Sequence, residues 1–102
     1  MRIYLDFNAT TPPLPEVVET VTRVFATDFG NASSVHAYGQ RARALLDDAR
    51  AAVAALVDAE PSDIVFTSGG TEADNLALRG AADSLEPTGR REIITTPIEH
   101  EA

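Results

Sequence analysis

The sequence predicts an α/β fold, because two β-rich runs flank a segment with helical periodicity. The first run, Ile64-Val-Phe-Thr67, ends at a Ser-Gly-Gly turn, and the second run is Ile93-Ile-Thr-Thr96. Residues 68–92 lie between them and carry an apolar stripe at helical spacing. A helix of this length suits a right-handed crossover between parallel strands. We therefore expect a βαβ unit here, with Thr71 and Asp74 forming a capping box at the start of its helix.

Two further helices are expected before this unit. Pro15 suits the first turn of a helix, and apolar side chains at positions 17–25 fall on one face. Apolar residues recur at intervals of three and four between positions 42 and 57, which predicts a second amphipathic helix. Ser33 or Ser34 is placed to cap it. Residues 3–5 are expected to form a short strand that the proline-rich stretch at 8–15 ends.

Composition and charge exclude several classes of function. The net charge is −8 in 102 residues, which disfavours nucleic-acid and anionic-membrane binding. All eight basic residues are arginine, and the chain contains neither lysine nor cysteine. Disulfides, thiolate metal sites and thiol nucleophiles are therefore excluded within this chain. The first residues have no apolar run of signal-peptide length, so we expect a cytoplasmic location.

The turn after the first β-rich run predicts an anion-binding site. Where a strand ends and a helix begins, free backbone N–H groups and the positive end of the helix dipole converge. Glycine at position 70 lets the backbone approach an anion closely, and the Thr71 hydroxyl can donate a further hydrogen bond. The alternative, a tight turn with a threonine cap and no ligand, remains open at this point.

Three further polar residues are candidates for the same crevice. If the two β-rich runs are parallel neighbours, their carboxyl ends share one sheet edge, which brings His100 beside the glycine turn. An imidazole there could stack on a flat heterocycle or transfer protons near neutral pH. Asn8 and His36 follow other loops and are weaker candidates. Capping by asparagine, or a structural role for a partly buried histidine, is the alternative for each of these two.

Four motifs follow one another along the chain: Tyr4-Leu-Asp6 with Ala9-Thr-Thr-Pro12, Gly30-Asn-Ala-Ser-Ser-Val-His36 with Gly39, Phe66-Thr-Ser-Gly-Gly-Thr-Glu72 with Asn75, and Glu99-His100. These motifs resemble those of the NifS-like cysteine desulfurases, within the class V aminotransferase group of fold-type I pyridoxal-phosphate enzymes. The third residue of the second motif is alanine where proline is usual. Four signatures in the same order make the resemblance specific across nearly the whole chain.

The resemblance implies a cofactor, a reaction and a role for each candidate residue. Gly70 and Thr71 would hold the phosphate of pyridoxal 5'-phosphate, while His100 would stack on its ring and assist proton transfer at the substrate. Asn8 and His36 would lie toward the substrate. The parent enzyme would convert L-cysteine to L-alanine and an enzyme persulfide, passing sulfur to an acceptor or scaffold protein for iron–sulfur cluster assembly or thiolation. A homodimer is implied for the full-length protein.

The resemblance also implies that the chain contains parts of two domains and that it lacks two residues needed for activity. Residues 1–60 would be the N-terminal arm and helices of the small domain, and residues 61–102 the truncated start of the large cofactor-binding domain. Such enzymes need a cofactor-binding lysine and a cysteine nucleophile, and this chain has neither. We therefore expect an N-terminal fragment that is inactive alone. Selenocysteine lyase, another class V aminotransferase and a stand-alone non-catalytic module remain as alternatives.

Overall fold

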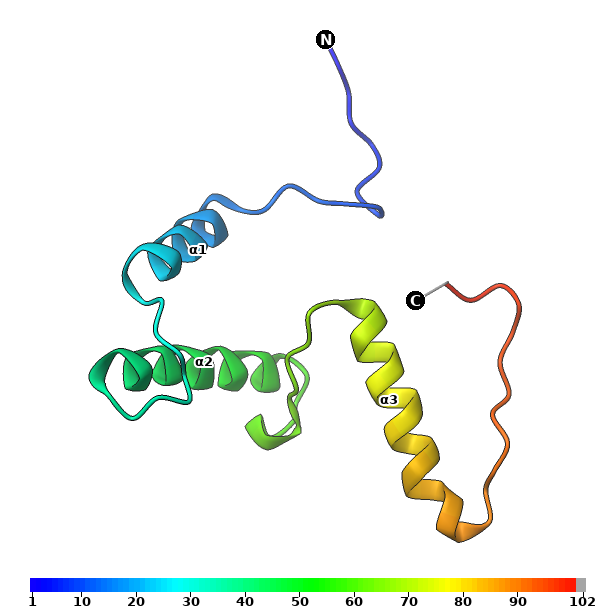
Figure 1. The fold of residues 1–102 in the computed structure, drawn as a ribbon. Coiled ribbons are helices and arrows are strands. Elements are labelled where there is room, and N and C mark those ends of the chain that lie inside the picture. Colours follow the sequence, from blue (N-terminus) through cyan, green and yellow to red (C-terminus); the bar gives the residue numbers. More distant parts are fainter. Residues whose placement is uncertain (101–102) are drawn as a thin grey trace. The chain divides into compact units, whose positions relative to one another are not determined.

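Three helices dominate the computed structural model, which describes residues 1–100 (Figure 1). Short 3₁₀ segments follow two of them, and extended or irregular chain connects the elements. In chain order the elements are α1 (Pro15–Thr27), α2 (Ala37–Leu56), η1 (Pro61–Asp63), α3 (Gly70–Leu85) and η2 (Glu86–Thr88). All three expected helices are therefore present, and α1 begins at the proline that the sequence marks as its first turn.

The chain folds as two compact units, Met1–Ile64 and Val65–Ala102. The first unit contains α1, α2 and η1, and the second contains α3 and η2. None of the helices in residues 1–100 is long and apolar enough to cross a membrane.

In the first unit, the 3₁₀ segment η1 packs against the end of α2. The side chain of Arg50, on α2, donates a hydrogen bond from Nε to the carbonyl oxygen of Ile64 at 3.3 Å. The backbone N–H of Ala59 returns to the carbonyl of Ala54 at 3.0 Å, which closes the turn after the helix. Ala54 is 1% exposed and is the one buried apolar residue of the described chain.

The predicted strands are not shown by the structure. Residues 3–5, 64–67 and 93–96 are extended or irregular, and no strand is assigned within residues 1–100. A helix satisfies its backbone hydrogen bonds within one segment, whereas a strand needs a neighbouring strand for every N–H and C=O. The helical periodicity therefore appears as structure here, while the βαβ unit stays a prediction.

Large apolar side chains remain exposed on all three helices and on the chain that connects them. Examples are Phe25 on α1 at 79%, Leu56 on α2 at 83% and Ile94 after η2 at 94%. The amphipathic faces that the sequence predicts are present, but they are covered only in part, as at Leu45 and Leu46, which are half-buried. Such faces normally pack against other parts of a fold, so stability in these units comes from local contacts.

Candidate functional site

The glycine turn at the start of α3 has the backbone geometry of an anion site. Gly69 is the N-cap residue and supplies no side-chain hydrogen bond to the helix. The backbone N–H of Ala73 donates to the carbonyl of Gly69 at 3.1 Å, which is the first bond of the helical ladder. The N–H groups of the three residues Gly70–Glu72 precede that bond and have no acceptor within the helix. They point, with the positive end of the dipole, at the space before α3.

The space around this turn is open. A Cβ atom built on Gly69 or on Gly70 would meet no other atom within 4 Å. Gly69 has an extended backbone with φ 166°, so it is not held there by left-handed strain. A ligand can therefore approach the main chain directly, and the free N–H groups fit a phosphate group. Thr71 is exposed beside them, and the side-chain amide of Asn75 donates to its carbonyl oxygen at 2.8 Å.

A carboxylate, rather than the predicted capping box, holds the chain that enters α3. Thr71 and Asp74 do not cap the helix, because the helix has already begun at Gly70 with Gly69 as its N-cap. Instead, Glu72 Oε2 accepts hydrogen bonds from the Ser68 backbone N–H at 2.7 Å and from its Oγ at 2.6 Å. The hydroxyl bond, and then the backbone bond, lowers the pKa of Glu72 below its ordinary value. The sequence contained this signal as Ser68 four residues before a glutamate.

His100 lies in the same compact unit as the glycine turn. It is exposed and is the last residue that the structure describes. The chain between η2 and His100 contains no helix or strand and turns at residues 97–99, and the paired strands that would bring the imidazole to the glycine turn are not shown. Its place over the anion site therefore stays a prediction.

In the first unit, His36 has a defined structural role. It is the N-cap of α2, where its Nδ1 accepts a hydrogen bond from the backbone N–H of Gly39 at 3.3 Å. The expected cap by Ser33 or Ser34 is wrong, because the helix begins after both. A structural role for a partly buried histidine is the alternative considered for His36; the residue is exposed, and its role as a cap does not exclude a ligand contact from the other ring nitrogen.

Asn8 lies in a short turn near the N-terminus. The turn is closed by backbone bonds from Ala9 and Thr10 to the carbonyl of Asp6, at 3.2 and 3.3 Å. The Tyr4 hydroxyl lies within hydrogen-bond distance of the carbonyls of Asp6 and Thr10, at 2.8 and 3.0 Å, and its one proton serves these two acceptors. Asn8 is thus exposed at the tip of an ordered turn, and its substrate-side role stays a prediction.

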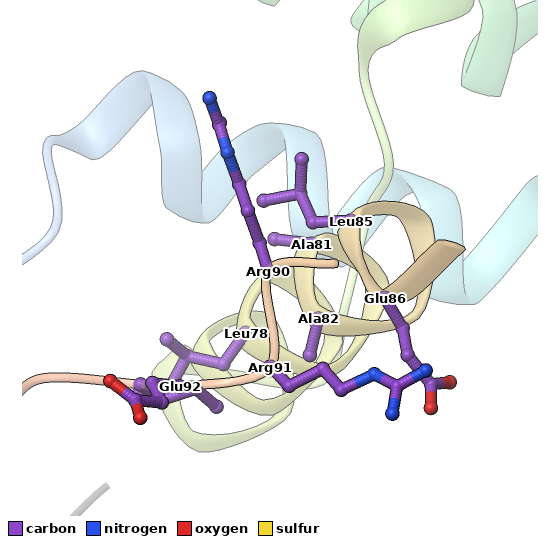
Figure 2. A pocket seen from close by; sticks show the side chains of 9 residues that line it. Leu78, Ala81, Ala82, Leu85, Glu86, Arg90, Arg91 and Glu92 are labelled. Carbon is purple, nitrogen blue, oxygen red and sulfur yellow. The ribbon is translucent and has the colours of Figure 1, made fainter. Parts of the chain in front are cut away.

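The second unit also has an apolar groove that is separate from the glycine turn. Figure 2 shows it between the C-terminal half of α3 and the chain after η2, with Leu78, Ala81 and Ala82 facing that chain. Its volume is about 420 Å³, and residues 90–93 form its other side. Leu78 follows Thr71 by roughly two helical turns, about 10 Å along the axis, so the groove is not part of the anion site.

Within residues 1–100, no group of three or more histidine, cysteine, aspartate or glutamate side chains could hold a metal ion. The donor groups that are present at the turn, backbone N–H and hydroxyl, select an anion rather than a cation.

Comparison with known proteins identifies the family of the chain. The family model described as aminotransferase class-V matches residues 3–102, and the chain therefore belongs to the class-V aminotransferase family. Membership supports the α/β class of fold. No solved structure matches the chain.

The relatives named as enzymes are similar over nearly the whole chain. The chain is 50% identical to the putative cysteine desulfurase IscS 1 of Bacillus subtilis over 99% of its residues, and 48% identical to the cysteine desulfurase IscS of Dechloromonas aromatica over 100%. It is 43% identical to the selenocysteine lyase of Xenopus laevis over 99%. The chain spans about a quarter of the length of these relatives, 26%, 25% and 26% respectively.

Proposed function

We propose that this chain is the N-terminal part of a pyridoxal-phosphate-dependent cysteine desulfurase, with the anion-binding turn as its cofactor phosphate site. The observation that carries the proposal is the open glycine turn at the start of α3, with three helix N–H groups free of helical acceptors. Relatives named cysteine desulfurase at about half identity support the assignment of the substrate.

Each candidate residue has a proposed task. Gly70 and Thr71 bind the cofactor phosphate through backbone N–H groups and the Thr71 hydroxyl, since these donors need no cation and complement a dianion. His100 holds a proton on its imidazole and positions the cofactor ring. Asn8 and His36 lie toward the substrate in this proposal. Pyridoxal phosphate, when bound, supplies the electron sink for chemistry at the substrate α-carbon.

The proposal assigns the remaining steps to residues outside this chain. Residues 1–60 belong to the small domain, and residues 61–102 begin the large domain with a βαβ unit. A full-length enzyme of this type needs a lysine and a cysteine, which these 102 residues lack. We propose that the full-length protein is a cytoplasmic homodimer that converts L-cysteine to L-alanine and passes sulfur to an acceptor protein for iron–sulfur cluster assembly or thiolation.

The Thr71→Ala variant of a full-length protein carrying this chain tests the cofactor site. Removing one hydrogen bond to a charged group costs about 1.5–3 kcal/mol, so cofactor affinity should fall by roughly 10- to 100-fold. The measurement is the cofactor retained after dialysis. Thr71→Ser should keep the cofactor, and Thr22→Ala, on the exposed surface of α1, should not change it. Unchanged retention in Thr71→Ala would remove this residue from the site.

His100 has a different expected signature. Its replacement by alanine should lower turnover more than cofactor retention, because the phosphate contacts remain while the proton-carrying group is lost. Turnover and retention are measured on the same preparation. An equal loss of both would assign His100 to cofactor binding alone.

Selenocysteine lyase is the second candidate function. The 43% identity to a relative of that name favours it as an alternative within the same fold and cofactor class. Turnover of L-cysteine and L-selenocysteine by the full-length protein separates the two. Strong preference for the selenium substrate would replace our proposal with this one.

A further inference from the structure

Asp28 is the one buried charged residue within residues 1–100. Its side chain is fully shielded from solvent, and it directly follows the last residue of α1. A buried carboxylate is costly unless it is paired and hydrogen-bonded. Its presence in a chain that buries almost nothing else marks a contact with a specific role.

Two arginines from different helices pair with this carboxylate. Arg23, on α1, donates from Nη1 to Asp28 Oδ2 at 2.8 Å. The Thr27 hydroxyl lies 3.2 Å from the same oxygen, although its shorter hydrogen bond, at 2.8 Å, goes to the Arg23 carbonyl. Arg41, on α2, lies in ion-pair range of Oδ1 through its Nε, although this contact lacks hydrogen-bond alignment. One carboxylate thus joins the end of α1 to the first turns of α2.

The segment between these helices, residues 29–36, is the loop that Asp28 closes. A Cβ on Gly30 would overlap the backbone carbonyl of Tyr38, and one on Gly39 would overlap the backbone oxygen of Ser34. The loop therefore packs backbone to backbone on the first turn of α2. An Asn31 turn fixes its middle, since Asn31 Oδ1 accepts from the Ser33 N–H at 2.9 Å.

His36 ends this loop as the N-cap of α2, and the ring of Phe29 stacks on Tyr38 at 5.9 Å between centroids. Both ends of the loop are therefore anchored, and between them it is held by packing and by its own turn. The polar side chains that it presents have one backbone conformation from which to bind a ligand.

We infer that Asp28 is a positioning residue, which through Arg23 and Arg41 holds the 29–36 loop in the conformation that binds substrate. This inference rests on the proposed function, in which the His36 segment lies toward the substrate. Asp28 itself is shielded and acts through the loop rather than by contact with ligand.

The Asp28→Asn variant of the full-length holoenzyme tests this inference, with Asp48→Asn as the matched control. Asp48 lies on α2 and is exposed, so the same substitution there removes no buried pair. In Asp28→Asn we expect amide hydrogen exchange of residues 30–36 to rise at least about tenfold. The KM for L-cysteine should rise about tenfold or more, with cofactor content and kcat nearly unchanged. Asp28→Glu keeps the negative charge, so its increases in hydrogen exchange and in KM should be smaller than those of Asp28→Asn.

Other outcomes separate the failure of the inference from that of the proposed function. If kcat, cofactor content and melting temperature of Asp28→Asn fall together while exchange rises throughout the protein, Asp28 is only structural and the inference is overturned. If wild type does not consume L-cysteine, the proposed function fails, and exchange still decides whether Asp28 holds the loop. If Asp28→Asn does not fold, Arg41→Gln takes its place, because it keeps the ion pair between Asp28 and Arg23. Amide hydrogen exchange of residues 30–36 and the KM for L-cysteine then decide the inference.

Discussion

The two units use glycine for opposite purposes. In the first unit, Gly30 and Gly39 leave no room for a side chain, because backbone oxygens occupy the place of a Cβ. In the second unit, Gly69 and Gly70 are surrounded by open space. Close packing makes the 29–36 loop rigid, whereas openness leaves the start of α3 accessible to a ligand. The same residue type thus indicates a packed loop in one unit and a binding surface in the other.

The largest expected effect is on the packed side of this comparison. Gly39→Ala in the full-length protein should destabilise the fold by about 1–3 kcal/mol, because its methyl group would also lie 2.7 Å from the Asn31 carbonyl oxygen. Thermal unfolding measures the loss. Gly80→Ala is the control, since Gly80 lies in α3 with nothing within 4 Å and should gain up to about 1 kcal/mol. Equal changes in the stability of the two variants would contradict the view that Gly39 is needed for close packing.

Gly70→Ala should separate stability from binding. Its Cβ meets no atom of the protein, so the free energy of unfolding should change by about 1 kcal/mol or less. A methyl group at the anion site should nevertheless weaken cofactor retention, because the backbone can no longer approach the phosphate as closely. Dialysis and thermal unfolding of the same sample check both parts. Loss of stability without loss of cofactor would contradict an open binding turn.

Glu72 should make the second unit sensitive to pH. Its pKa is lowered in the folded state by the Ser68 bonds, so its contribution to stability is present above the ordinary carboxyl pKa. That contribution is lost as pH falls through the lowered pKa. Glu72→Gln should therefore be less stable than wild type at neutral pH, and the difference should shrink in acid. Melting temperatures across this range test the sign, and a constant difference would exclude the carboxylate as its cause.

The smallest loss of stability is expected on removal of an exposed ion pair of α2. Arg43 Nε lies 2.9 Å from Asp47 Oδ2, and both side chains are about half exposed, at 59% and 49%. Solvent screens such a pair, so Arg43→Ala should cost about 0–1 kcal/mol in unfolding free energy. Arg41→Ala, which removes a partner of the buried Asp28, should cost clearly more. Comparable losses of unfolding free energy in the two variants would show that the burial of Asp28 does not strengthen its ion pair with Arg41.

The helices could be predicted because their signals are local. Pro15 marks the start of α1, and the apolar spacing after position 42 marks α2. The N-cap residues were harder to predict. His36 and Gly69 are the N-caps of α2 and α3, and serine or threonine is in general favoured over them at this position. The Glu72–Ser68 bonds were missed because the helix starts two residues earlier than the predicted capping box requires.

The strands and the complete site depend on contacts that a local pattern does not contain. Residues 64–67 and 93–96 have strong β propensity, but propensity alone supplies no partner for the backbone. The start of α3 at the glycine pair could be predicted from glycines followed by a helical pattern, and the structure begins the helix there, whereas anion binding at this turn stays a prediction. The juxtaposition of His100 with Gly70 depends on paired strands, and for that reason it stays a prediction.

The most direct measurement of the central claim compares pyridoxal phosphate with pyridoxal. Calorimetry on a full-length wild type and on its Thr71→Ala variant gives the affinity of both proteins for each compound. The ratio of the two affinities is the loss that the substitution causes for that compound. If the start of α3 binds the phosphate, the variant should lose roughly 10- to 100-fold in affinity for pyridoxal phosphate and almost none for pyridoxal. Equal losses for the two compounds, or no loss for either, would contradict a phosphate site at this turn.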